Sequence, residues 1–79
     1  MQVTVRYFAA FREAAGRETE TVETRACTPR VLFDECRSRY AELQAWESSL
    51  VAINDEMARW DSEIGEGDEV LFFPPVAGG

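Results

Sequence analysis

The sequence contains no lysine and no histidine among its 79 residues. The absence of histidine removes the usual general base, activator of nucleophiles and metal ligand. The absence of lysine removes Schiff-base chemistry. Catalysis by this chain alone would have to use carboxylates, cysteines or the chain termini, and we expect no metal site.

Long apolar runs and paired cysteines are scarce as well. No apolar run approaches the roughly 18 residues that a membrane-spanning helix needs. The first residues show no basic segment followed by an apolar one. Cys27 and Cys36 have the spacing neither of a redox pair nor of zinc ligands. We therefore expect a cytoplasmic protein with reduced thiols and no membrane partner.

Basic residues are few compared with acidic ones. Eight arginines face 15 aspartates and glutamates, and the net charge is −7. Such a surface repels phosphate backbones, so we expect no nucleic-acid partner and favour a basic protein partner. With 46% hydrophobic residues, the chain can still form one domain with a small core.

Alternating apolar residues and turn signals predict five strands and one main helix. Val3, Val5 and Tyr7 share one face of the first strand, which places Phe8 on the other face. A short helical turn that Gly16 ends is expected at residues 9–15. The strands are expected at residues 2–8, 18–24, 50–53, 57–60 and 69–73.

The main helix is expected to begin at Thr28, whose side chain can cap it, with Pro29 in the first helical position. The segment that follows, up to residue 49, is expected to place Trp46 against the core. Apolar residues at helical spacing form the buried stripe of this helix, namely Leu32, Cys36, Tyr40 and Leu43.

This order of elements predicts an α+β protein with the β-grasp, or ubiquitin-like, architecture. The helix lies across one face of a mixed sheet, and the first and last strands lie side by side in the middle. Carboxylates on the second strand are expected to be solvated at the sheet edge, namely Glu18, Glu20 and Glu23. We expect residues 1–73 to form the domain and residues 74–79 an extended, flexible tail.

The tail combines stiff and flexible residues. Pro74 and Pro75 end the last strand and favour an extended chain, whereas Gly78 and Gly79 carry no side chain. Six extended residues reach roughly 20 Å. A thin tip of this kind can enter a narrow channel, where a partner can activate its carboxylate.

The ending FFPPVAGG, residues 72–79, preceded by GDEV at 67–70, resembles the ending of the small, sulfur-carrier subunit of molybdopterin synthase. This family belongs to the MoaD/ThiS group of ubiquitin-like proteins. The segments Tyr7-Phe8-Ala9, 12–16 and 52–54 are similar to the same family. The resemblance spans the whole chain. This chain departs from the family at residues 64–67, which read IGEG where an Asp-Gly is more usual. The departure lies outside the tail.

The resemblance implies a cycle in which an ATP-using, ubiquitin-activating-type enzyme adenylates Gly79 and a sulfur donor protein converts it to a thiocarboxylate. The tail, Pro74, Pro75, Val76, Ala77 and Gly78, would then enter the large synthase subunit, in a heterotetramer. There the sulfur would attack cyclic pyranopterin monophosphate to form molybdopterin. The acid and base groups would belong to the large subunit, and ATP to the activating enzyme, so this chain would bind no cofactor itself.

The alternation also predicts a docking surface. Phe8, Met57 and Phe73 are expected on the sheet face opposite the helix, where they would form an apolar patch beside the tail. The alternative is that Phe8 or Phe73 folds back on the sheet edge.

Other functions remain open at this point. Cys27 precedes the helix, where the helix dipole can favour a thiolate, so a persulfide carrier is an alternative to a tolerated, half-buried thiol. The carboxylates between residues 61 and 69 could bind a cation, although their spacing favours a solvated surface. A Gly-Gly ending also suits a carrier for thiamine, cysteine or tRNA thiolation, or a ubiquitin-like protein modifier.

Overall fold

A computed structural model describes residues 1–43 and 49–74 of the chain. The order of elements is the expected one, and the third and fifth strands have the expected bounds. The elements are β1 (Gln2–Tyr7), α1 (Ala10–Ala15), β2 (Thr19–Glu23), α2 (Pro29–Arg39), β3 (Leu50–Ile53), β4 (Glu56–Ala58) and β5 (Glu69–Phe73).

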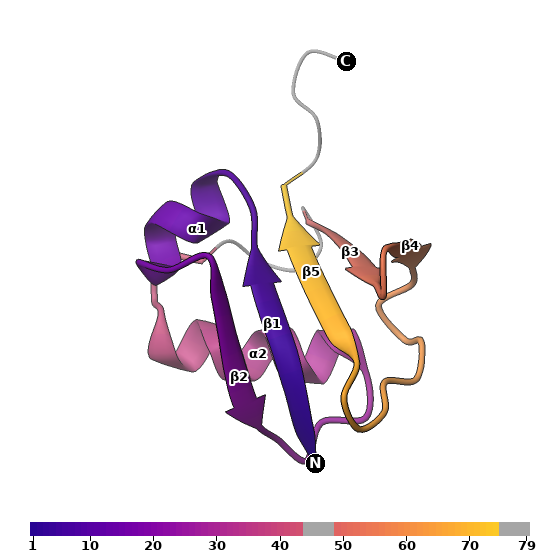
Figure 1. Cartoon of the computed structure of the whole chain (residues 1–79). Helices are drawn as coiled ribbons and strands as arrows, with labels where there is room; N and C mark the ends of the chain where they lie inside the picture. Colours follow the sequence, from indigo (N-terminus) through magenta and orange to yellow (C-terminus); the bar gives the residue numbers. More distant parts are fainter. Residues whose placement is uncertain (44–48, 75–79) are drawn as a thin grey trace.

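The five strands form one mixed sheet in the order β2-β1-β5-β3-β4. The central pair, β1 and β5, is parallel, and the other neighbours are antiparallel. Helix α2 lies across one face of the sheet, and no helix of residues 1–43 and 49–74 covers the other, which we call the open face (Figure 1). The predicted β-grasp architecture, with the first and last strands in the middle, is therefore confirmed.

Helix α2 begins as the sequence predicts, because the Thr28 hydroxyl accepts a hydrogen bond from the backbone N–H of Val31 at 3.4 Å. Its end was predicted wrongly. The helix stops at Arg39, so Tyr40 is its C-cap and Leu43 is buried beyond it. The apolar stripe continues into the loop, where burial no longer depends on helical spacing.

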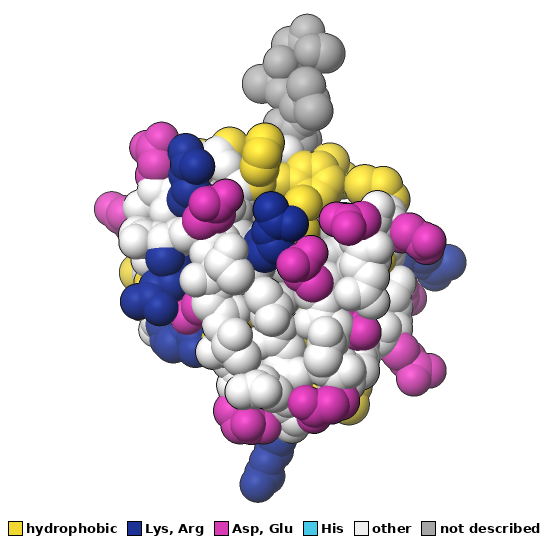
Figure 2. All heavy atoms as spheres, viewed as in Figure 1, with side chains coloured by type: hydrophobic (Ala, Val, Ile, Leu, Met, Phe, Trp, Pro, Cys, Tyr) yellow, Lys and Arg dark blue, Asp and Glu magenta, His cyan; other side chains and the backbone are white. Residues whose placement is uncertain are grey.

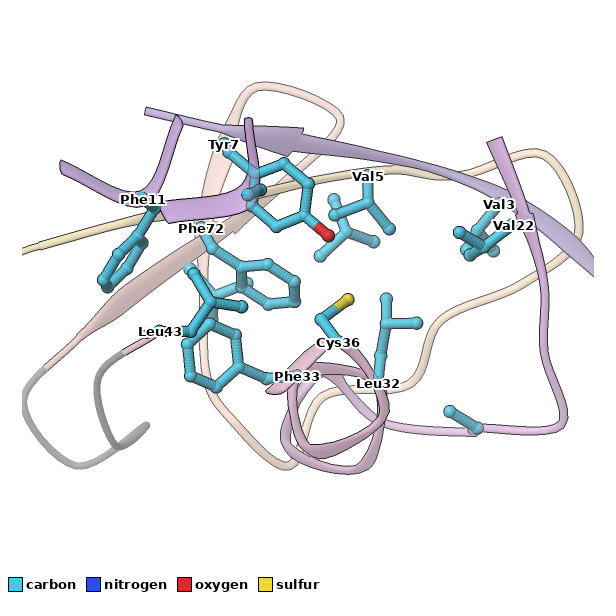
Figure 3. Close-up of a cluster of buried hydrophobic side chains, with 14 of the residues drawn as sticks. Val3, Val5, Tyr7, Phe11, Val22, Leu32, Phe33, Cys36, Leu43 and Phe72 are labelled. Carbon is cyan, nitrogen blue, oxygen red and sulfur yellow. The ribbon is translucent and has the colours of Figure 1, made fainter. Parts of the chain in front are cut away.

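The core lies between α2 and the helix-facing side of the sheet (Figure 3). Leu32 and Cys36 are buried as expected, and so is Phe33, which the predicted stripe omits. The Phe33 ring meets Phe72 of β5 edge-on with centroids 4.7 Å apart, and the Trp60 ring stacks on Phe72 at 5.8 Å. Aromatic contacts of this kind add to the stability from burial alone. They fix α2 against the last residues of β5.

The fourth strand is shorter than predicted, since β4 ends at Ala58 rather than at residue 60. The indole N–H of Trp60 donates to the carbonyl of Ser49 at 3.2 Å, and the Trp60 carbonyl accepts from the N–H of Arg30 at 3.1 Å. These bonds tie Trp60 to the segment before β3 and to α2, so it cannot continue the strand. The other tryptophan, Trp46, lies outside the described residues.

Glu20 is not solvated, which corrects the prediction for the edge strand. Its side chain is 9% exposed because Glu20 pairs with Val5, whose side chain faces α2. Tyr7 and Tyr40 donate their hydroxyl hydrogens to its carboxylate at 2.6 and 3.2 Å, and Arg39 donates at 3.2 Å. These partners compensate the cost of burying the charge. The other two carboxylates of the predicted edge are exposed as expected.

Candidate functional site

The candidate site lies on the open face of the sheet, at the end where β5 stops. Phe72 is fully buried towards α2, so the next residue, Phe73, points to the open face. Tyr7 is likewise buried, and Phe8 follows it. The structure therefore places Phe8 and Phe73 on the same face, as the alternation predicts.

Met57 joins this face through the ladder, because it pairs with Ala52, which in turn pairs with Leu71 of β5. Met57 is 66% exposed and Phe8 is 60% exposed. The sequence interpretation missed two members, Leu71 and Leu50, although the alternation within β3 and β5 could have found them. We call the whole set the open-face patch: Phe8, Leu50, Met57, Leu71 and Phe73 (Figure 2).

Backbone pairing fixes the patch to the start of the tail. The N–H of Phe8 donates to the carbonyl of Phe72 at 3.1 Å, and Leu50 pairs with Phe73 across β3 and β5. Pro74 follows, half-buried, as the last described residue of the tail. The other predicted tail and carrier residues lie outside the described residues: Pro75, Val76, Ala77, Gly78 and Gly79.

A strained turn joins Phe8 to helix α1. Ala9 has φ 55° and ψ −125°, in the region of positive φ that favours glycine. The N–H of Phe11 donates to the carbonyl of Phe8 at 3.0 Å, so the turn has type II′ geometry with Ala9 in the position that glycine usually fills. Such a conformation costs about 1–3 kcal/mol. The buried Phe11 side chain holds the turn in place.

Charged groups border the patch. Arg6 and Glu69 form an ion pair of 3.3 Å on the open face, and each side chain is 38% exposed. Figure 2 shows further carboxylates along the edges of this face. The arrangement suits a partner whose apolar surface is flanked by basic residues. The negative net charge of this chain would also attract such a partner.

The two thiols differ in exposure. Cys36 is buried in the core, and burial raises the pKa of its thiol, which keeps it protonated and unreactive. Cys27 is exposed, and its carbonyl accepts a hydrogen bond from the N–H of Ile64 at 3.0 Å. This thiol is therefore held beside the loop that precedes β5, not at the end of β5 where the tail begins.

The acidic loop before β5 is organised by its own hydrogen bonds. Asp68 accepts from the N–H of Gly65 at 2.8 Å and from the side-chain amide of Asn54 at 3.1 Å. Within residues 1–43 and 49–74, no three His, Cys, Asp or Glu residues are grouped so that they could hold a metal ion. The helices of the same residues are too short or too polar to cross a membrane.

The fold and the site together define a class of protein, a ubiquitin-like β-grasp domain with an apolar patch beside the start of a segment that ends in Gly-Gly. The family model described as the ThiS family matches residues 5–79. The chain belongs to the ThiS family.

Curated relatives agree across the whole length. The molybdopterin synthase sulfur carrier subunit of Mycobacterium tuberculosis is 37% identical over 82 residues, covering 100% of this chain and 99% of the relative. The protein of the same name from Escherichia coli is 34% identical over 84 residues, covering 98% and 99%. Both alignments cover nearly the whole chain and nearly the whole relative.

Solved structures confirm the fold. SAMP1 from Haloferax volcanii superimposes with a TM-score of 0.82 at 26% identity and covers 100% of both chains. Molybdopterin converting factor, subunit 1, from Pyrococcus furiosus gives 0.78 at 30% identity, covering 96% of this chain and 99% of that chain. A chain of the BexX/CysO complex from Amycolatopsis orientalis gives 0.69 at 29% identity, covering 98% and 99%.

Proposed function

We propose that this chain is the sulfur carrier subunit of a molybdopterin synthase and that the carboxylate of Gly79 carries the sulfur. The relatives that share this name are 31–37% identical to the chain over nearly its whole length. The observation that carries the proposal is the open-face patch at the start of a segment ending in Gly-Gly. The proposal includes a cytoplasmic location for this carrier.

The first step activates the terminal carboxylate. A ubiquitin-activating-type enzyme joins the Gly79 carboxylate to the α-phosphate of ATP and releases pyrophosphate. A sulfur donor protein then delivers sulfur at the oxidation level of sulfide to the acyl carbon, and AMP leaves. The product is a thiocarboxylate, which is ionised at neutral pH and nucleophilic without a neighbouring base. This chemistry suits a chain that has no histidine.

The second step takes place in the large synthase subunit, which docks on the open-face patch. Residues 74–78 enter that subunit as a thin strand and bring the sulfur to the pterin precursor. The large subunit supplies the acid–base groups, because this chain has neither lysine nor histidine to provide them, and it also binds the phosphate of the precursor. Two carriers and two large subunits would form a heterotetramer, and this chain itself binds no cofactor.

Intact-mass analysis tests the proposal. Incubation with the activating enzyme, ATP and a sulfur donor should add about 16 Da at the C-terminus, because sulfur replaces oxygen. Adding the large subunit and the pterin precursor should restore the original mass and yield molybdopterin. Deletion of Gly79 should abolish the mass gain. Normal pterin sulfuration by that deletion variant would contradict the proposal.

The same experiment separates the alternatives. Cys27→Ala should leave the gain of about 16 Da unchanged. A gain of about 32 Da that this substitution removes would instead favour a persulfide on Cys27. Adducts with lysines of other proteins would favour a modifier function, since one similar structure is that of the H. volcanii small archaeal modifier protein 1. Thiocarboxylate formation without transfer to the pterin precursor would favour a carrier for another sulfur pathway.

A further inference from the structure

Ala9 adopts a backbone conformation that its side chain makes unfavourable. Its φ of 55° and ψ of −125° suit glycine, which lacks the β-carbon that causes the strain. The backbone of Ala9 is useful to the fold, since its carbonyl accepts from the N–H groups of Arg12 and Glu13 at 3.0 and 3.3 Å. Glycine would provide the same carbonyl, so these bonds do not explain why a methyl group is present.

The folded chain gives the Ala9 methyl group no visible compensation. Ala9 is exposed and does not belong to the buried core of the described residues. The contacts that hold this turn act through its backbone and through the Phe11 side chain, and glycine would keep them. The added cost of the methyl group therefore points to a benefit that arises when the chain binds something.

The position of Ala9 indicates what that partner is. Ala9 follows Phe8, whose exposed ring belongs to the open-face patch and whose N–H is bonded to Phe72. Figure 1 shows the turn into α1 at the same end of the sheet as the end of β5. Ala9 therefore directly follows a residue of the patch, in a turn at the end of the sheet where β5 stops.

We propose that the Ala9 side chain is a contact of the docking surface and that the large synthase subunit buries its methyl group. The inference rests on the proposed function, and it extends the patch from the sheet onto the turn before α1. The strain is present in the unbound chain, and the apolar contact offsets it in the complex.

The β3–β4 turn offers a matched control. Asp55 has φ 70°, is exposed and is not part of the open-face patch. Substitution of Ala9 or of Asp55 by glycine removes a β-carbon from a residue with positive φ. Because Asp55→Gly also removes a charge, it should be compared with Asp55→Asn, which removes the same charge and keeps a side chain.

The experiment measures thermal unfolding of the full chain and its affinity for the large subunit by calorimetry. Ala9→Gly should raise Tm and weaken binding roughly three- to tenfold, the range of a peripheral interface contact. Asp55→Gly should raise Tm by a smaller amount, because aspartate tolerates positive φ, and should bind like Asp55→Asn. Ala9→Gly binding as tightly as the wild type would overturn the inference.

A D-alanine variant separates contact from flexibility, since glycine also makes the turn freer. The chain can be joined from two synthetic segments between Ala26 and Cys27. D-alanine at position 9 favours positive φ but places its methyl group elsewhere. It should bind as weakly as Ala9→Gly. Full affinity of the D-alanine chain would show that restriction of the turn matters and would overturn the contact.

The wild-type titration keeps the two proposals apart. If the wild-type chain fails to bind the large subunit, the proposed function and the Ala9 contact are both overturned. If the wild type binds and Phe8→Ala weakens the complex while Ala9→Gly does not, only the Ala9 contact is overturned.

Discussion

The backbone N–H of Phe8 donates to the carbonyl of Phe72 at 3.1 Å, although β1 ends at Tyr7. Pairing between the two central strands thus continues one residue further, with the Phe8 ring exposed and the Phe72 ring buried. The bond joins the open-face patch to β5. A partner that binds Phe8 would therefore also meet the end of β5 in a defined position.

Truncation of the patch should weaken docking without unfolding the chain. Phe8→Ala and Met57→Ala each remove an exposed side chain that we expect to be buried in the complex. Each substitution should weaken the affinity for the large subunit about tenfold or more, as central apolar contacts do. Isothermal titration calorimetry measures this, and circular dichroism checks that the fold is unchanged.

Val31 provides the control for this experiment. It is an apolar residue of α2 that is 42% exposed, on the opposite side of the sheet from the patch. Val31→Ala should leave the affinity unchanged. An equal loss in Val31→Ala and Phe8→Ala would show that the partner does not select the open face.

The buried carboxylate of Glu20 should matter for stability. Glu20→Gln removes the charge that accepts hydrogen bonds from Tyr7, Tyr40 and Arg39. We expect the free energy of unfolding in urea to fall by about 1–3 kcal/mol, because charged hydrogen bonds are lost and polar groups lose partners. Glu18→Gln, on the exposed part of the same segment, should change it by less than about 0.5 kcal/mol. Equal effects would mean that the network contributes nothing.

Much of the fold could be predicted because local signals and burial agree. The bounds of β5 follow from an apolar run between Asp68 and Pro74, and Asn54 and Asp55 have the positive φ that their residue types favour. Glu20 was misread although it lies two residues from the buried Val22 in β2, so alternation places its side chain towards α2. The partners that make a buried carboxylate tolerable come from other elements, and no local pattern shows them.

The site was predictable to a similar degree. Alternation around Tyr7 and Phe72 is enough to place Phe8 and Phe73 on the open face. The strain at Ala9 could not be predicted, because alanine has no preference for positive φ. Tertiary contacts on both sides impose it, through the Phe8 bond to β5 and the burial of the α1 side chains.

Alkaline pH should destabilise the fold. Burial, with hydrogen bonds to Cys36 and Glu20, raises the pKa of Tyr7, and burial raises the pKa of Cys36. Unfolded cysteine ionises near pH 8.5 and tyrosine near pH 10, roughly, so unfolding releases protons above these values. The contribution of these two protonated groups to the free energy of unfolding is therefore fully present below about pH 8.5 and decreases as the pH rises further. Urea unfolding from pH 7 to 11 measures this. Cys36→Ala should move the onset towards pH 10, and an unmoved onset would contradict the assignment to Cys36.

The two thiols should react with an aromatic disulfide reagent at very different rates. Cys27 is exposed and should react within the mixing phase, whereas Cys36 is fully buried between α2 and the sheet. Because the folded environment also raises the pKa of Cys36, its reaction should wait for unfolding. We expect one fast thiol in buffer and two in concentrated urea. Cys27→Ala should abolish the fast reaction and retain the second one in urea. A fast thiol in Cys27→Ala under native conditions would show that α2 does not protect Cys36.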